Sequence, residues 1–147
     1  MVPADEGGEA SGRPPAAVTL IVDGANVMGS RADGWWRDRA GAMARLHDEL
    51  AALAARGVPG ADGTVIRQPR IILVVEGKSR AAAGLVAPDP RVELVAAPGE
   101  GDEEIARLSG SVPGRRIVVT ADQRLRERCQ RAGAEVAGPR WLTGLLA

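Results

Sequence analysis

Four runs of apolar residues, separated by segments with a different periodicity, organise this chain. They cover residues 18–22, 71–75, 92–95 and 117–119. Uninterrupted Val, Ile and Leu runs of this length are typical of strands in a parallel sheet, because helices cover both faces of such a sheet. Residues 135–137 are a candidate fifth strand, followed by a terminal turn.

The segments between the strands carry helical patterns. In the longest one, from about residue 35 to residue 56, apolar side chains recur every three or four positions. A Gly-Val-Pro-Gly stretch at 57–60 ends it, and residues 60–69 are expected to be a surface connection. Shorter helices are expected at 79–85, 102–109 and 125–132. This alternation predicts a single-domain α/β three-layer sandwich around a central, mainly parallel sheet of about five strands.

The chain has 147 residues, enough for one domain with a substantial core. Residues 1–16 are rich in Gly, Pro, Ala and acids, so we expect a disordered tail before a folded domain at 17–147. No apolar stretch is long enough to cross a membrane, and the N-terminus lacks the pattern of a secretory signal. We therefore expect a cytoplasmic protein that does not associate with membranes.

Composition excludes some chemistry. Cys129 and His47 are the single cysteine and the single histidine, so neither an internal disulfide nor a Cys/His zinc site can form. We expect Cys129 to be buried and His47 to lie on the surface. The formal net charge is zero, which argues neither for nor against a polyanionic partner.

Acidic residues follow each of the four apolar runs. Asp23, Glu76 and Asp122 come after three of the runs, and residues 100–104 contain four acids after another. The carboxyl ends of parallel strands meet at one edge, where such sheets bind ligands. Carboxylates gathered there repel one another unless a cation lies between them. A hard divalent ion is the simplest candidate because it prefers oxygen ligands.

Each acid also has a purely structural interpretation. Asp23 before a glycine is typical of a tight turn, and Asp122 could cap a helix. Acids at 100–104 would stabilise the positive end of the helix that follows. An ion pair with a neighbouring basic side chain explains Glu76 as well as metal binding does.

Three segments resemble the acidic motifs of the PIN-like nucleases, specifically the NYN branch: residues 22–27 (VDGANV), 100–105 (EGDEEI) and 120–125 (TADQRL). Residues 29–39 resemble the extension of the first motif in a bacterial subgroup of that branch. The resemblance implies a PIN-like fold and a metal-dependent ribonuclease, expected to be an endonuclease, that uses Mg²⁺ or Mn²⁺.

The resemblance also implies roles for single residues. Asp23, Asp102 and Asp122 match the metal-binding acids, and Asn26 matches the asparagine of the first motif. Glu103 stands where related sequences often have a second Asp. Glu76 has a weaker counterpart and is a candidate metal ligand. The expected catalytic residues are therefore Asp23, Asn26, Asp102, Glu103 and Asp122.

Basic residues near the same edge are candidates for contacts with RNA phosphates, although arginines at helix starts are usually solvated. They are Arg31, Arg37, Arg39, Lys78, Arg80, Arg124 and Arg128. Trp35 and Trp36 could stack on unpaired bases, but we expect at least one of them to be buried.

Two other functions stay open at this stage. One is an RNA-binding domain of the same fold with weak or no catalysis. The other is a receiver-like phosphoryl-transfer domain, which Lys78 fits poorly because it follows an early strand. The chain lacks a Gly-rich phosphate loop, so we expect no nucleotide cofactor. A homodimer is a possible assembly.

Overall fold

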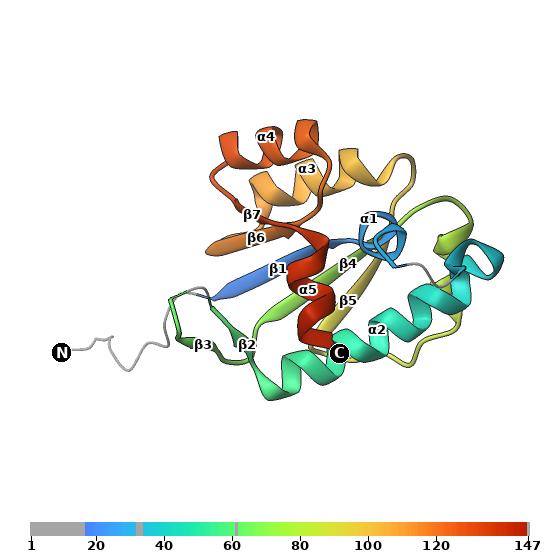
Figure 1. Cartoon of the computed structure of the whole chain (residues 1–147). Coiled ribbons are helices and arrows are strands. Elements are labelled where there is room, and N and C mark those ends of the chain that lie inside the picture. Colours follow the sequence, from blue (N-terminus) through green and yellow to red (C-terminus); the bar gives the residue numbers. More distant parts are fainter. Residues whose placement is uncertain (1–16, 32–33, 61, 147) are drawn as a thin grey trace.

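The computed structural model describes residues 17–31, 34–60 and 62–146, so the predicted tail at 1–16 lies outside the described residues. Its centre is a five-stranded parallel sheet in the order β5-β4-β1-β6-β7 (Figure 1). The strands are β1 (Val18–Asp23), β4 (Arg70–Val75), β5 (Val92–Ala96), β6 (Arg115–Val119) and β7 (Glu135–Ala137).

Helices cover both faces of this sheet (Figure 1). One face packs against α1 (Gly24–Gly29), α2 (Arg39–Arg56), α5 (Pro139–Leu146) and the 3₁₀ segment η2 (Gly77–Gly84). The other face packs against α3 (Gly101–Ser111) and α4 (Gln123–Arg131). The 3₁₀ segment η1 (Trp35–Arg37) precedes α2. This is the predicted α/β three-layer sandwich, and it is consistent with a PIN-like fold.

The strands read as continuous apolar runs because alternate side chains enter two separate cores. In β1, Leu20 and Val22 pack on the side of α2, whereas Ile21 packs on the side of α3. Leu73 of β4 joins the first core and Ile72 the second, and all five side chains are almost fully buried. The sheet is therefore anchored on both faces, which holds its carboxyl edge in place.

The order of the strands creates a switch point in the sheet. From β1 the chain adds β4 and β5 on one side, then crosses back to place β6 and β7 on the other. The loops that leave β1 and β6 thus turn to opposite faces, with a crevice between them where open α/β sheets bind their ligands. Asp23 ends β1, and residues 120–122 follow β6.

The five predicted strands and the long helix are confirmed. The expected surface connection at 60–69 contains part of an antiparallel hairpin, β2 (Val58–Pro59) with β3 (Val65–Ile66). Two further helices, α1 and α5, were not predicted. Helix α1 begins at Gly24, where the sequence was interpreted as a tight turn. Helix α5 begins at Pro139, whose fixed φ suits a first helical position. No helix within the described residues is long and apolar enough to span a membrane.

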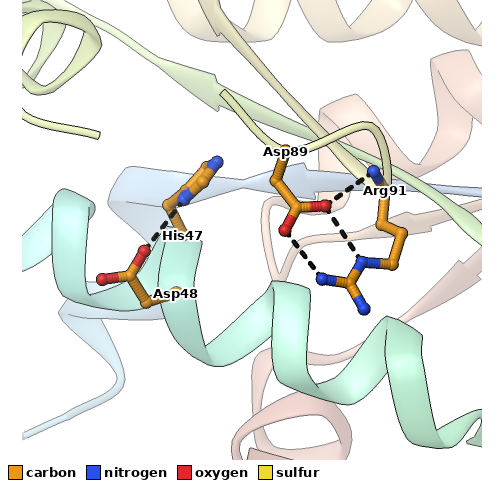
Figure 2. A network of polar contacts seen from close by, with 4 residues as sticks. All are labelled: His47, Asp48, Asp89 and Arg91. Carbon is orange, nitrogen blue, oxygen red and sulfur yellow. Dashed lines mark hydrogen bonds and ion pairs between the residues drawn. The ribbon is translucent and has the colours of Figure 1, made fainter. Parts of the chain in front are cut away.

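The expectation that His47 lies on the surface is wrong, because its side chain is only 3 % exposed. It sits four residues after Met43 on the buried face of α2, and residues at that spacing share one side of a helix. Its Nδ1 lies 3.2 Å from Oδ1 of Asp48 (Figure 2). The neighbouring Asp89 is turned to Arg91, with 2.9 Å between Oδ2 and Nη2 (Figure 2). Cys129 is fully buried, as predicted.

Candidate functional site

The candidate site begins with Asp23, the last residue of β1. Its side chain caps α1, since Oδ1 accepts a hydrogen bond of 3.3 Å from the backbone N–H of Asn26. The other oxygen, Oδ2, accepts a hydrogen bond of 2.9 Å from the hydroxyl of Thr120, which follows β6. Both carboxylate oxygens are therefore held, one by each side of the switch point.

A second hydrogen bond joins the two loops, and two more order the segment that follows β6. The backbone N–H of Ala121 donates to Oδ1 of Asn26 at 2.8 Å. The hydroxyl of Thr120 accepts from the N–H of Asp122 at 3.2 Å, and Asp122 in turn caps α4 through the N–H of Leu125 at 3.1 Å. Segments 97 residues apart in the sequence thus form one rigid junction. The capping role expected for Asp122 is confirmed, whereas Asp23, expected in a tight turn, is the N-cap of α1.

Gly24 permits the close packing of this junction. A Cβ atom at that position would lie 2.8 Å from the carbonyl oxygen of Val74 in the adjacent strand β4 and 3.0 Å from Sδ of Met43. Neither a backbone oxygen nor a buried core side chain can easily give way. A larger residue at position 24 would therefore push α1, and with it Asn26, away from the sheet.

Glu76 joins the end of β4 to the start of α3. Its Oε1 accepts a hydrogen bond of 3.2 Å from the backbone N–H of Gly101. A Cβ atom on Gly101 would lie 2.5 Å from that same oxygen, so a side chain here would displace the carboxylate from this position. The ion pair with a neighbouring basic residue that could have explained Glu76 is replaced by this contact with the first turn of α3.

The pKa of Asp23 is shifted by its surroundings in the junction. Burial raises the pKa of Asp23 above its ordinary value of 3.8, and the charges of Glu76 and Asp122 add smaller effects in the same direction. The hydrogen bonds from Thr120 and Asn26 act the opposite way but do not cancel the burial. The ionised form of Asp23 is therefore stabilised by specific donors and still disfavoured by its surroundings.

Asp102 and Glu103 lie in the first turn of α3, and each has a hydrogen-bond partner outside the junction. Oδ1 of Asp102 accepts a hydrogen bond of 3.0 Å from the N–H of Glu103. Glu103 pairs with Arg128 of α4, with 2.9 Å between Oε2 and Nη1, and this contact lowers the pKa of the Glu103 carboxyl. Glu103 is thus held as part of an α3–α4 ion pair.

The oxygen atoms of the described residues around Asp23 are of the kinds that bind a hard cation, but their arrangement does not form a complete binding site. Carboxylate, amide and hydroxyl oxygens are the ligands that Mg²⁺ and Mn²⁺ take in proteins. Within residues 17–31, 34–60 and 62–146, however, no three Asp, Glu, His or Cys side chains are gathered closely enough to hold a metal. Asp23, Asp102 and Asp122 therefore do not form a complete ligand group in this conformation. Mg²⁺ commonly needs only one or two carboxylates, with waters and substrate oxygens as the remaining ligands.

Most of the basic residues singled out by the sequence have partners on the protein. Arg31 pairs with Glu49 of α2 at 3.0 Å, Arg80 lies 3.4 Å from the carbonyl of Ala97, and Arg128 pairs with Glu103.

Two further arginines lie near tryptophan rings. The guanidinium group of Arg39 lies 5.0 Å from the ring centre of Trp35, and that of Arg37 lies 5.8 Å from the ring centre of Trp36, within reach of cation–π contacts. Lys78 and Arg124 are exposed.

The two tryptophans lie in different environments. Trp35 is partly buried and packs against the core on the α2 side of the sheet, so it is the anchor of the pair. Trp36 is 56 % exposed.

Two features of the site were missed in the sequence. The first is Thr120, whose hydroxyl bridges Asp23 and Asp122. A threonine two residues before an acid at a strand end is the available signal. The second feature is an open groove of about 570 Å³ beside Asn26. Its wall includes Arg140, which no sequence pattern indicated because α5 was read as a turn.

Comparison with known proteins supports the fold. No protein-family model matches this chain, and no curated protein matches it either. Among solved structures, a single-site mutant of Rae1 (YacP) from Bacillus subtilis has a similar fold, with a TM-score of 0.62 and 18 % sequence identity. The match covers 87 % of this chain and 73 % of that one. At this level of identity the two proteins share an architecture, and the chemistry must be argued from the site itself.

Proposed function

We propose that this protein is a metal-dependent ribonuclease that hydrolyses RNA phosphodiester bonds at the carboxyl edge of its sheet, as an endonuclease. The observation that carries the proposal is the locked junction at the switch point, where Asp23 is held by Thr120 and Asn26. The proposed nuclease domain comprises residues 17–147, and its proposed setting is the cytoplasm.

In this proposal Asp23 and Asp122 hold Mg²⁺ or Mn²⁺ together with Glu76 or Asp102. A bound divalent ion would lower the pKa of a water molecule and neutralise charge on the phosphate. Thr120 and Asn26 fix the orientation of Asp23. Because burial and the charges of Glu76 and Asp122 raise the pKa of Asp23, the carboxylate has much to gain from a nearby cation. That gain is the physical argument for a metal at this edge.

RNA would be held by positive charge around the acidic centre. Lys78 and Arg124 are exposed and available for phosphate contacts. Arg31 and Arg128 would have to exchange their present carboxylate partners for phosphate, which Arg binds with the same planar geometry. For the exposed Arg128–Glu103 pair such an exchange costs little, because exposed ion pairs contribute at most about 1 kcal/mol.

The direct test is cleavage of a labelled RNA by the purified protein in Mg²⁺ or Mn²⁺. Cleavage should depend on the metal, stop in EDTA, and disappear in Asp23→Asn while the variant keeps its circular dichroism spectrum. Asp48→Asn is the matched control, since Asp48 is an exposed acid on α2 outside the site. Undiminished cleavage by Asp23→Asn would refute the proposal.

A second candidate is an RNA-binding domain that does not turn over. Two observations favour it: the described residues contain no complete three-ligand group, and Glu103 is committed to Arg128. Thermal unfolding with increasing Mn²⁺ separates the two functions. A working site should raise the melting temperature by mass action, and Asp23→Asn should remove the effect. RNA binding without either the Mn²⁺ shift or cleavage would favour the second candidate.

A further inference from the structure

An open groove lies directly beside the acidic junction. Its volume is about 570 Å³, within the range of roughly 300–1,000 Å³ usual for ligand sites. It runs between α1, the loop after β6 and the start of α5, which packs next to α1 (Figure 1). Its lining consists of Ala25, Asn26, Gly29, Ser30, Ala121, Gly138, Pro139 and Arg140.

The groove and the acidic junction share two residues. Asn26 and Ala121 line the groove, and they are also the partners of the 2.8 Å hydrogen bond that ties α1 to the loop after β6. Asn26 in turn donates its backbone N–H to Asp23. A chain lying in the groove would therefore contact Asn26, which is hydrogen-bonded to Asp23 of the proposed cleavage centre.

The lining suits one strand of nucleic acid. Most of the residues are small or apolar, and Arg140 supplies a positive charge at an exposed position. Unpaired bases present apolar faces that a duplex hides in its stack, while every nucleotide carries a phosphate that an arginine can bind. We propose that this groove binds a single strand of RNA next to the cleaved bond, with Arg140 contacting a phosphate. The inference rests on the proposed function and assigns its substrate class.

Two glycines allow a sharp test. Gly29 and Gly110 both end or nearly end a helix, and a Cβ atom at either position would meet nothing within 4 Å. Gly29 lines the groove, whereas Gly110 lies near the end of α3, which leads away from the carboxyl edge toward β6. Gly29→Phe should fill the groove without disturbing the fold, and Gly110→Phe adds the same side chain elsewhere.

Binding is measured by fluorescence anisotropy with a short labelled single-stranded RNA in EDTA, so that the readout does not require catalysis. We expect Gly29→Phe to weaken binding roughly tenfold, because its side chain would occupy space that the bound strand needs. Gly110→Phe should bind like the wild type. A duplex of the same sequence should compete poorly with the labelled strand.

Arg140→Glu gives an independent answer should Gly29→Phe fail to fold. Arg140 is exposed, and its loss should weaken binding and reduce the dependence on salt by about one unit of slope. Arg45→Glu, on an exposed position of α2, is the control for total charge. Equal binding by the Arg140 and Arg45 variants would overturn the assignment, as would wild-type affinity in a folded Gly29→Phe or equal competition by the duplex.

The same data keep the two proposals distinct. Binding that depends on the groove without any metal-dependent cleavage would refute the ribonuclease and leave the groove in place. Cleavage by the wild type that is unaffected by Gly29→Phe and Arg140→Glu would refute the groove and leave the ribonuclease.

Discussion

Replacing Thr120 by valine removes one hydroxyl group and keeps the shape of a fully buried side chain. That hydroxyl donates to Oδ2 of Asp23 at 2.9 Å and accepts from the N–H of Asp122 at 3.2 Å. Thr120→Val therefore tests whether the junction between the two loops depends on a single buried group. Thr120→Ser is the control, because it loses a methyl group and keeps the hydroxyl.

The size of the effect follows from the partner's charge. A hydrogen bond to an ionised group contributes about 1.5–3 kcal/mol, while the N–H of the exposed Asp122 can turn to water instead. We therefore expect Thr120→Val to lower the free energy of unfolding by about 2 kcal/mol. In a chain of this length that corresponds to a fall of roughly 4–8 °C in melting temperature.

The effect should also depend on pH in a defined direction. The hydrogen bond from Thr120 is the largest influence that lowers the pKa of Asp23, so its loss should raise that pKa further. The penalty should be full where Asp23 is ionised and should shrink as the pH falls through the pKa of the folded protein. Urea unfolding in metal-free buffer across a pH series measures both quantities. A variant as stable as the wild type at neutral pH, or a penalty in Thr120→Ser of the same size, would refute the reasoning.

Three further predictions follow from single contacts. Asp23→Asn should raise the melting temperature at neutral pH without metal. The raised pKa of Asp23 means that ionisation is less favourable in the folded state, so the stability of the wild type falls as the pH rises above 3.8. The difference in melting temperature between Asp23→Asn and the wild type should therefore vanish at lower pH. Gly101→Ala should destabilise the protein by roughly 1–3 kcal/mol in urea unfolding, because its Cβ would displace the Glu76 carboxylate 2.5 Å away. The pKa of Asp89, lowered to about 2 mainly by the hydrogen bond from Arg91, should return toward 3.8 in Arg91→Ala when the carboxyl carbon is titrated by NMR. Its stabilising contribution should be present above 3.8 and lost as pH falls through about 2.

The sheet could be predicted because the signal for each strand is local. Each strand is a continuous apolar run, which is typical of a strand buried between two layers of helices. The helices that escaped prediction, α1 and α5, are short, and their sequences contain Gly or Pro that resemble turns. The position of His47 was wrong for a related reason. One polar residue within a long helix was assigned from its chemical type, although its spacing from Met43 already placed it on the buried face.

The candidate site was predictable only to the level of the sheet edge. That Asp23 and Asp122 would meet followed from parallel strands, but the threonine between them did not, since the contact joins residues 97 positions apart. The hydrogen-bond partners of the acids in α3 could not be predicted either. Glu103 and Arg128 lie on different helices, and whether they pair depends on how α3 and α4 pack. Side-chain direction at a helix start is decided by such tertiary contacts, which no spacing rule contains.

The way Asp23 is held argues against a purely structural role for this edge. A helix cap needs one acceptor oxygen, and an exposed Asp, Asn or Ser would serve. Here the second oxygen of the capping residue is bound by a buried hydroxyl, and its pKa is raised, mainly by burial and to a smaller extent by two further carboxylates. A neutral asparagine would cap α1 through its single acceptor oxygen and avoid the repulsion, but its amide nitrogen would not accept a hydrogen bond from the Thr120 hydroxyl. A carboxylate held where burial disfavours its ionised form is typical of a group with a functional role, such as binding a cation. If Asp23→Asn proves no more stable than the wild type at neutral pH in EDTA, that tension does not exist, and the argument for a cation at this edge loses its physical basis.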